Sequence, residues 1–152
     1  MQICQGVKYW HDKKLLHRDL KSQNIFMTSD GQVKIGDFGI SKILEHTKDN
    51  VHTLVGTPCY LSPEIIENQS YNLKSDIYAL GVMLYEMWAL KHPFKADSIH
   101  ALAVQIVAGK YDPISEDYSA DLRSLAYNLL FKDPSKRLNI DQIIDYLVRK
   151  PL

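Results

Sequence analysis

The residues HRDLKSQN, at positions 17–24, separate two segments of different character. The stretch carries a carboxylate at Asp19, an ammonium at Lys21 and a carboxamide at Asn24. The residues before it have helical spacing, and the residues after it favour β-strands. We therefore expect this stretch to be a polar loop between a helix and a strand.

A helix is predicted on the N-terminal side of this polar loop, over residues 1–14. Ile3, Val7 and Trp10 recur there at helical spacing. The pattern is already present at the first residue, with no N-cap and no loop before it. Such a start is expected of a helix that has been cut within its length.

A small β-hairpin is predicted on the C-terminal side. Two short β-favouring runs, 24–28 and 32–35, are separated by Ser29-Asp30-Gly31. A D-G step between such runs is a hairpin signal. From Gly36 to about Ser70, polar residues, glycines and prolines predict one long loop, and loops of that length are usually functional.

Everything after Lys74 is predicted to be helical. Apolar residues on several faces of the first helix predict that it is buried nearly all round. Capping residues predict where each helix begins and ends. The expected helices are one with Ser75 or Asp76 as N-cap, one after Ser98 that turns Ile99 inward and ends at Gly109, one after Ser119, and one from about Asn139.

Composition excludes several classes of protein. The chain has 152 residues, 45% hydrophobic and 24% charged, with 18 Lys and Arg against 18 Asp and Glu. This balance argues against nucleic-acid and acidic-membrane binding, which need a basic excess. The longest apolar segment, 77–90, is too short for a membrane span and is interrupted by Glu86. Cys4 and Cys59 form no C-x-x-C pair, which favours a reduced, intracellular chain.

Three motifs in this order resemble the catalytic domain of eukaryotic serine/threonine protein kinases. HRDLKSQN matches the catalytic loop H-R-D-L-x-x-x-N, Asp37-Phe38-Gly39 follows the hairpin, and Ser62-Pro63-Glu64 is a variant of the motif that closes the activation segment. The resemblance implies a mostly α-helical fold with a small β-hairpin, the C-terminal lobe of the α+β kinase fold, with the N-terminal lobe absent. Residues 1–152 would form this one lobe, with catalytic loop 17–24, activation segment 37–64 and helical subdomain 74–150.

The resemblance assigns roles that suit phosphoryl transfer, which depends on positioning and charge neutralisation more than on covalent chemistry. Asp19 would accept or orient the substrate hydroxyl proton, and Lys21 would neutralise charge on the phosphoryl group that leaves ATP. Asn24 and Asp37 would supply oxygen ligands to two Mg²⁺ ions, which prefer oxygen. Phe26 is either part of the floor under the adenine or an ordinary core aromatic residue.

Substrate class and regulation are also implied by the resemblance. Lys21 and Thr57 are typical of kinases with serine or threonine acceptors, although Thr57 can also be read as a turn residue before proline. Arg18 before the catalytic Asp resembles kinases that are activated by loop phosphorylation. A phosphate on Thr53, the favoured position, or on Thr47, the weaker candidate, would pair with Arg18 and also with Lys42. The alternative is that both threonines are plain loop hydroxyls.

Two further carboxylates are expected to be structural. Glu64 and Arg137 resemble the partly buried ion pair that fixes the end of the activation segment to the late helices. Asp76 resembles the carboxylate at a helix start that accepts hydrogen bonds from the backbone around His17 and Arg18. Neither carboxylate is expected to be catalytic.

Longer stretches are similar to the NIMA-related (Nek) kinases: LHRDLKSQNIF at 16–26, KIGDFGISK at 34–42 and VGTPCYLSPE at 55–64. The similarity covers essentially the whole chain. It departs at Cys59, Tyr78 and Leu138, where the family usually has Tyr, Trp and Pro. None of these positions is catalytic.

The sequence contains no Gly-rich phosphate loop and no upstream Lys–Glu pair, both of which a complete kinase needs. We therefore expect the chain alone to be inactive and marginally stable. One hypothesis is a serine/threonine protein kinase, represented by part of its catalytic domain. The alternative is an inactive fragment or a pseudokinase-like scaffold. A small-molecule kinase is disfavoured, because the long activation segment is typical of enzymes that dock proteins.

The implied cofactors are ATP and Mg²⁺, and the implied partner is a protein with a serine or threonine acceptor. A regulatory protein partner is compatible with the family, whereas nucleic acid and membrane are not expected partners. The expected location is cytoplasmic, with cytoskeletal or nuclear association implied by the resemblance.

Overall fold

The computed structural model describes residues 1–36 and 58–150. These residues are mostly helical with one two-stranded antiparallel sheet, which confirms the predicted fold class. The elements are helices α1 (Gln2–Asp12), α2 (Pro63–Ile66), α3 (Leu73–Ala89), α4 (Ile99–Ala108), α5 (Ala120–Leu129) and α6 (Ile140–Arg149), strands β1 (Ile25–Met27) and β2 (Val33–Ile35), and 3₁₀ turns η1 (Ser22–Asn24), η3 (Pro58–Tyr60) and η4 (Pro134–Lys136).

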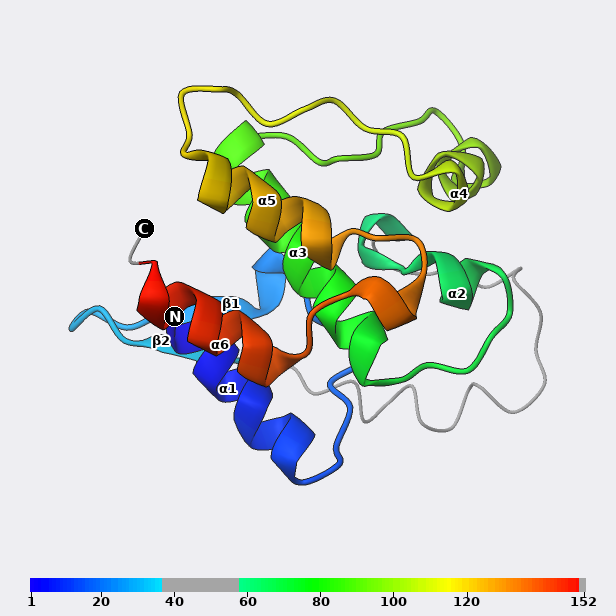
Figure 1. The fold of residues 1–152 in the computed structure, drawn as a ribbon. Coiled ribbons are helices and arrows are strands. Elements are labelled where there is room, and N and C mark those ends of the chain that lie inside the picture. The colour runs from blue at the N-terminus through cyan, green and yellow to red at the C-terminus, as the bar shows by residue number, and fades with distance from the viewer. Residues whose placement is uncertain (37–57, 151–152) are drawn as a thin grey trace.

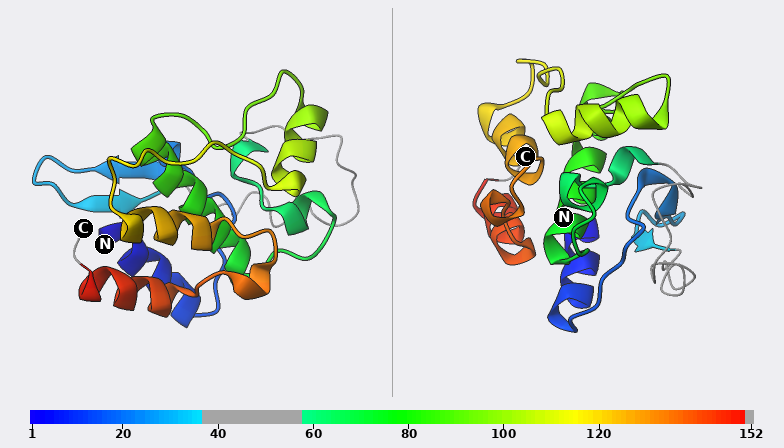
Figure 2. Two further views of the ribbon diagram at one scale, coloured as in Figure 1. Left: turned by 45° about the horizontal axis from the view of Figure 1, so that its top comes forward. Right: turned by 90° about the vertical axis from the view of Figure 1, so that its right-hand side faces the viewer.

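Helix α3 runs through the centre of the described structure (Figure 1). In the right-hand view of Figure 2, α5 and α6 lie on one side of α1 and α3, and the hairpin with the polar loop lies on the other. Helix α5 packs on α3, α6 packs on α1, and β2 contacts α1. The polar loop is therefore carried on one face of a helical core.

Burial of α3 is nearly all round, as its sequence predicts. Its buried residues run without a break from Ser75 to Met83 and include Tyr85. Gly81 permits close packing on α5, because a Cβ at this position would lie 2.7 Å from the Cβ of Leu129. Within residues 1–36 and 58–150, no helix combines the length and the apolar character needed to cross a bilayer.

The predicted N-cap of α3 was wrong. The helix begins at Leu73, and Asn72 caps it: the Asn72 side chain accepts a hydrogen bond from the Lys74 amide at 2.8 Å, while Ser75 Oγ accepts one from the Asn72 amide. This is a capping box, which satisfies amides of the first turn reciprocally. Ser75 and Asp76 are instead buried inside the first turn, where Asp76 is available for contacts outside the helix.

The caps of the later helices follow the prediction. Ser98, Ser119 and Asn139 cap α4, α5 and α6 through their side chains, and Gly109 ends α4 in the left-handed conformation, with φ +64°. Ile99 differs from its predicted inward orientation, because it is 50% exposed in the first turn of α4. The predicted long loop also contains the short helix α2, which begins at Pro63, where a missing amide costs nothing.

The hairpin forms with the predicted turn but with shorter strands. Ile25 pairs with Ile35 and Met27 with Val33, and Gly31 in the turn has φ +79°. Asn24 lies in the 3₁₀ turn η1 and not in the strand, because the Asn24 amide donates to Lys21 O at 3.0 Å. The polar loop thus ends in a tight turn that leads directly into β1.

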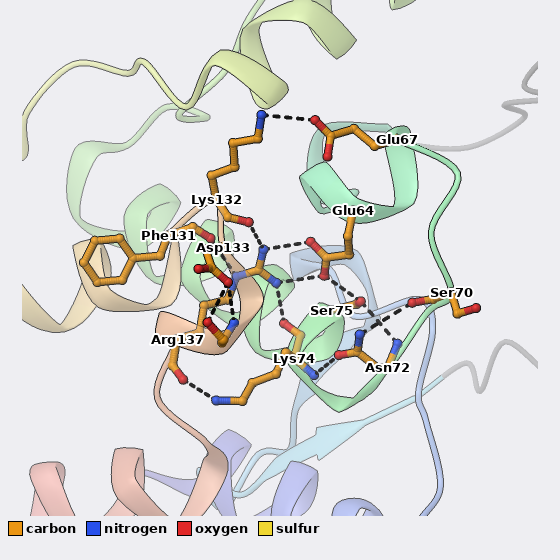
Figure 3. Close-up of polar contacts among 11 residues, drawn as sticks. Glu64, Glu67, Ser70, Asn72, Lys74, Ser75, Phe131, Lys132, Asp133 and Arg137 are labelled. Atoms are coloured by element: carbon orange, nitrogen blue, oxygen red, sulfur yellow. Dashed lines mark hydrogen bonds and ion pairs between the residues drawn. The ribbon is translucent and has the colours of Figure 1, made fainter.

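The predicted pair of Glu64 and Arg137 is present, and it is fully buried, with each residue 2% exposed (Figure 3). Arg137 Nη1 donates to Glu64 Oε1 at 2.8 Å, and Nη2 donates to Oε2 at 2.7 Å. Ser75 Oγ on α3 also donates to Glu64. The other guanidinium hydrogen bonds go to the backbone carbonyls of Lys74, Phe131 and Lys132.

These contacts determine the ionisation of Glu64. Burial by itself raises the pKa of a carboxyl, but the hydrogen bonds from Arg137 and Ser75 outweigh burial and hold the pKa of Glu64 below its usual value. The pair joins α2 to α3 and to the segment before α6, so it ties the start of α2 to the helical core.

Tyr78 packs against the same guanidinium. The Cζ atom of Arg137 lies 4.8 Å from the centre of the Tyr78 ring, which is a cation–π distance. Tyr78 is 0% exposed, and within the described residues its hydroxyl has no hydrogen-bond partner. A buried hydroxyl without a partner destabilises the folded state by roughly 1–3 kcal/mol.

Replacing Tyr78 by Phe should therefore stabilise the chain, by about 1 kcal/mol, because it removes the unpaired hydroxyl and keeps the ring. Urea unfolding of both proteins measures this. The control is Tyr85→Phe on the same helix, where the lost hydroxyl donates to Asp112 O at 3.0 Å and stability should fall. An equal decrease in the free energy of unfolding in the two variants would contradict the prediction.

Replacing Glu64 by Gln should lower the free energy of unfolding at pH 7 by about 3–5 kcal/mol, because Arg137 is left buried without a counter-charge. Since folding lowers the pKa of Glu64, its contribution is present above the unfolded value, about 4.3, and is lost as the pH falls through the folded value. The difference between wild type and Glu64→Gln should therefore shrink in acid.

The matched control for that measurement is Glu67→Gln. Glu67 pairs with Lys132 at 3.1 Å in a partly exposed position, where an ion pair contributes roughly 0–1 kcal/mol. Similar decreases in the free energy of unfolding in Glu64→Gln and Glu67→Gln would show that burial does not strengthen the pair of Glu64 and Arg137.

Candidate active site

The polar loop is attached to the core through Asp76 on α3. The Asp76 carboxylate accepts hydrogen bonds from the His17 amide at 3.0 Å, the Arg18 amide at 3.1 Å and the Tyr71 hydroxyl at 2.6 Å. His11 Nε2, on α1, lies 3.1 Å from Oδ2 of the same carboxylate. The predicted role of Asp76 is thus confirmed, and one carboxylate joins the loop to both α1 and α3.

Asp76 stays ionised despite complete burial. Burial by itself raises the pKa of this carboxyl, but the hydrogen bonds with His11, with Tyr71 and with the amides of His17 and Arg18 together hold its pKa below the usual value. An ionised acceptor makes shorter and stronger hydrogen bonds than a neutral one. The buried charge therefore strengthens the attachment of the loop.

Arg18 has an unusual backbone conformation, with φ +68°. This left-handed region is uncommon for residues other than glycine and costs free energy. The hydrogen bond from the Arg18 amide to Asp76 stabilises it. The turn at Arg18 leads the chain directly into Asp19.

The three predicted polar side chains of the loop come together. Lys21 Nζ donates to Asp19 Oδ2 at 2.8 Å, and Asn24 Nδ2 donates to the same oxygen at 3.1 Å and to Asp19 O at 2.8 Å. The side chains of Asp19 and Lys21 are each 19% exposed, so this pair is accessible from outside, whereas Asn24 is only 4% exposed. A carboxylate and an ammonium thus meet at the surface, and a buried carboxamide is hydrogen-bonded to the same carboxylate.

The donor set fits a hard divalent cation in part. Because the Asn24 amide nitrogen is bonded to Asp19, the amide is oriented with its oxygen as the atom available to a ligand, and Mg²⁺ prefers such oxygens. In the part of the chain that the structure describes, no cluster of three or more His, Cys, Asp or Glu residues could hold a metal ion by itself. Asp37, the other predicted ligand, lies outside the described residues.

Phe26 lies in β1, two residues after Asn24. Phe26 is 55% exposed, so the ring does not belong to the core. A Cβ at Gly36 would lie 2.7 Å from this ring, so glycine at position 36 leaves room for it. The Gly36 amide donates to Asn24 O at 2.9 Å, where the described part of the hairpin ends. The predicted regulatory residues Thr53 and Thr57 also lie outside the described residues.

Three residues at this site were not singled out from the sequence. His11 and Tyr71 contact Asp76, and the hydroxyl of Tyr60 contacts Ser22 in the polar loop. Two of these contacts join residues far apart in sequence, and Tyr71 lies in a segment without helical or strand periodicity. Periodicity and capping rules therefore give no signal for any of the three.

Known proteins resemble this chain over nearly its whole length. A family model described as "Protein kinase domain" matches residues 1–147. Serine/threonine-protein kinase Nek1 of Mus musculus is 50% identical over 145 residues, which is 95% of this chain. Serine/threonine-protein kinase Nek8 of Danio rerio is 49% identical over 149 residues, or 97% of this chain. A putative serine/threonine-protein kinase A of Trypanosoma brucei brucei is 41% identical over 145 residues, or 94% of this chain.

The matches cover only part of each relative. The aligned region is 12% of the length of Nek1, 21% of Nek8 and 34% of the trypanosome protein. The chain thus spans about a third or less of these curated relatives.

Replacing Asp76 by Asn should loosen the polar loop, because the charge and one acceptor oxygen are lost. We expect hydrogen exchange of the His17 and Arg18 amides to become about tenfold faster or more, since a hydrogen bond to a charged group contributes roughly 1.5–3 kcal/mol. Asp112→Asn is the control, because Asp112 pairs with Lys91 at the surface. Unchanged exchange at both amides would show that Asp76 does not hold the loop.

Proposed function

Because the chain belongs to the protein kinase domain family, we propose that it provides the C-terminal lobe of a serine/threonine kinase that transfers the γ-phosphate of ATP to serine or threonine hydroxyls of proteins. The observation that carries the proposal is the cluster of Asp19, Lys21 and Asn24, which the family motif requires and the loop geometry brings together. The proposed divisions are catalytic loop 17–24, activation segment 37–64 and helical subdomain 74–150.

Asp19 is proposed as the group that binds the acceptor hydroxyl. Its carboxylate can accept the hydroxyl proton and so orient the oxygen toward the phosphoryl group. Lys21 is already bonded to Asp19 Oδ2, so its ammonium is held where negative charge develops during transfer. This bond restricts both side chains before substrate binds, which favours positioning as the source of catalysis.

Asn24, together with Asp37, is proposed to hold Mg²⁺. The ions would neutralise negative charge on the phosphates of bound ATP. Asn24 Nδ2 is bonded to Asp19, which fixes the orientation of the amide oxygen. Phe26 is proposed to lie under the adenine, and its exposure on the hairpin supports this over a core role.

Acceptor class and regulation complete the proposal. Lys21 and Thr57 would mark a serine or threonine acceptor, and phosphate on Thr53 would pair with Arg18 and raise activity. A cytoplasmic location, with cytoskeletal or nuclear association, and a regulatory protein partner are proposed on the family resemblance. The alternative is a scaffold that binds partners without transferring phosphate, and it predicts no turnover by the complete protein.

Replacing Asp19 by Asn in the full-length protein should lower kcat by about 10²–10⁴-fold, the usual contribution of a positioned acid–base group. Transfer of ³²P from labelled ATP to a serine peptide measures this. The control is Asp12→Asn, an exposed residue on α1 that pairs with Lys8 and should leave kcat unchanged. Full activity of Asp19→Asn would refute its role, and absence of wild-type transfer with intact Mg²⁺-ATP binding would favour the scaffold.

A further inference from the structure

Strand β2 has one edge bonded to β1 and a second edge that faces α1. On the inner edge, the Thr28 amide donates to Gln32 O at 2.9 Å. Bonded and non-bonded pairs alternate along an antiparallel ladder, so Val33, the next residue, is in a non-bonded pair. The Val33 amide therefore points away from β1, at the outer edge of the hairpin.

The side-chain amide of Gln2 meets this outer edge. The Val33 amide donates to Gln2 Oε1 at 2.7 Å, and Gln2 Nε2 donates to Gly31 O at 3.4 Å. Gln2 is the first residue of α1, and Figure 1 shows β2 beside that helix. A carboxamide that accepts from one residue of a strand and donates to another replaces the contacts of a neighbouring strand. Gln2 thus pairs an edge at which strands usually present unpaired amides.

Gly6 provides a second contact between α1 and β2. It lies one helical turn after Gln2 and on the same face of α1. A Cβ at this position would lie 2.7 Å from Ile35 Cδ1, so glycine lets the helix and the strand approach closely. The hairpin is therefore held to α1 by a polar contact at Val33 and by close packing at Ile35.

The hairpin connects this attachment to Asn24. Strand β1 begins at the residue after Asn24, and the Gly36 amide, at the end of β2, donates to Asn24 O at 2.9 Å. The Asn24 side chain is bonded to Asp19 in the polar loop. A shift of β2 relative to α1 would therefore displace the Asn24 backbone while its side chain remains bonded to the loop.

We infer that Gln2 is a positioning residue for the proposed Mg²⁺ site: by pairing with the outer edge of β2 it fixes the hairpin on α1, and with it the amide oxygen of Asn24. The inference rests on the proposed function and deepens it, because it assigns a role in metal binding to a residue outside the catalytic loop. Gln2 acts only through the hairpin. Because Gln2 is exposed, its hydrogen bonds contribute little to the stability of the whole chain.

The test replaces Gln2 by Ala in the full-length protein, because alanine favours the helix and removes the carboxamide. Hydrogen exchange of the Val33 amide, measured without metal or nucleotide, should become about two- to tenfold faster, the range that corresponds to one hydrogen bond. The Mg²⁺ concentration that gives half-maximal phosphate transfer should rise by about two- to fivefold, part of the same range. The KM for the acceptor peptide and the urea concentration at half-unfolding should stay near their wild-type values.

Gln5→Ala is the matched control, because Gln5 is an exposed glutamine on the same helix. It should change neither the exchange of Val33 nor the Mg²⁺ requirement. Gln2→Glu keeps an acceptor oxygen for the Val33 amide, so it should restore slow exchange. Exchange as fast in Gln2→Glu as in Gln2→Ala would count against the assigned hydrogen bond.

Unchanged Val33 exchange in Gln2→Ala, or faster exchange with an unchanged Mg²⁺ requirement, would overturn the inference. A loss of activity of equal size at every Mg²⁺ concentration would also overturn it, because such a loss indicates a smaller folded fraction and not a weaker metal site.

Parallel measurement of Asp19→Asn separates the two claims. Loss of activity in Asp19→Asn with a wild-type Mg²⁺ requirement in Gln2→Ala would leave the proposed function standing and overturn the role of Gln2. Full activity in Asp19→Asn would refute the proposed function, and with it the positioning role, even if Val33 exchange showed that Gln2 holds the hairpin.

Discussion

The path of the polar loop depends on the buried negative charge of Asp76. A carboxylate with no exposure to water is expensive to bury, and it is stable only because the amides of the polar loop, Tyr71 and His11 lie within hydrogen-bond distance of it. Another path of the loop would take the His17 and Arg18 amides away from this charge. The position of the upstream end of the loop is therefore coupled to the stability of the fold.

Helix α3 extends the same principle along its length. Ser75 contacts Glu64 and so joins the helix to α2, Asp76 holds the start of the polar loop, and Glu86 holds Tyr60. All three side chains come from the most buried element of the described structure. Polar side chains of the loop, such as Asp19 and Lys21, can then be partly exposed while their positions are set from inside the core.

Sequence patterns predicted much of this fold for identifiable reasons. The hairpin followed from a D-G step, and α4, α5 and α6 followed from Ser98, Ser119 and Asn139, because caps and turns are local. The N-cap of α3 was misplaced because several polar residues precede that helix and any of them could cap it. Asn72 is the cap, whereas Asp76 accepts hydrogen bonds from the polar loop, a contact that local sequence does not reveal. The cluster around Asp19 was anticipated from its motif, whereas Tyr60 and His11 act across long sequence separations that spacing rules do not reach.

The left-handed backbone at Arg18 has a consequence for the side chain that it carries. Glycine would adopt φ +68° at no steric cost, whereas an arginine at the same place gives up part of the free energy of folding. The hydrogen bond from the Arg18 amide to the buried Asp76 carboxylate offsets part of this penalty. The same buried charge that fixes the path of the polar loop therefore also maintains a backbone conformation that an arginine would rarely adopt by itself.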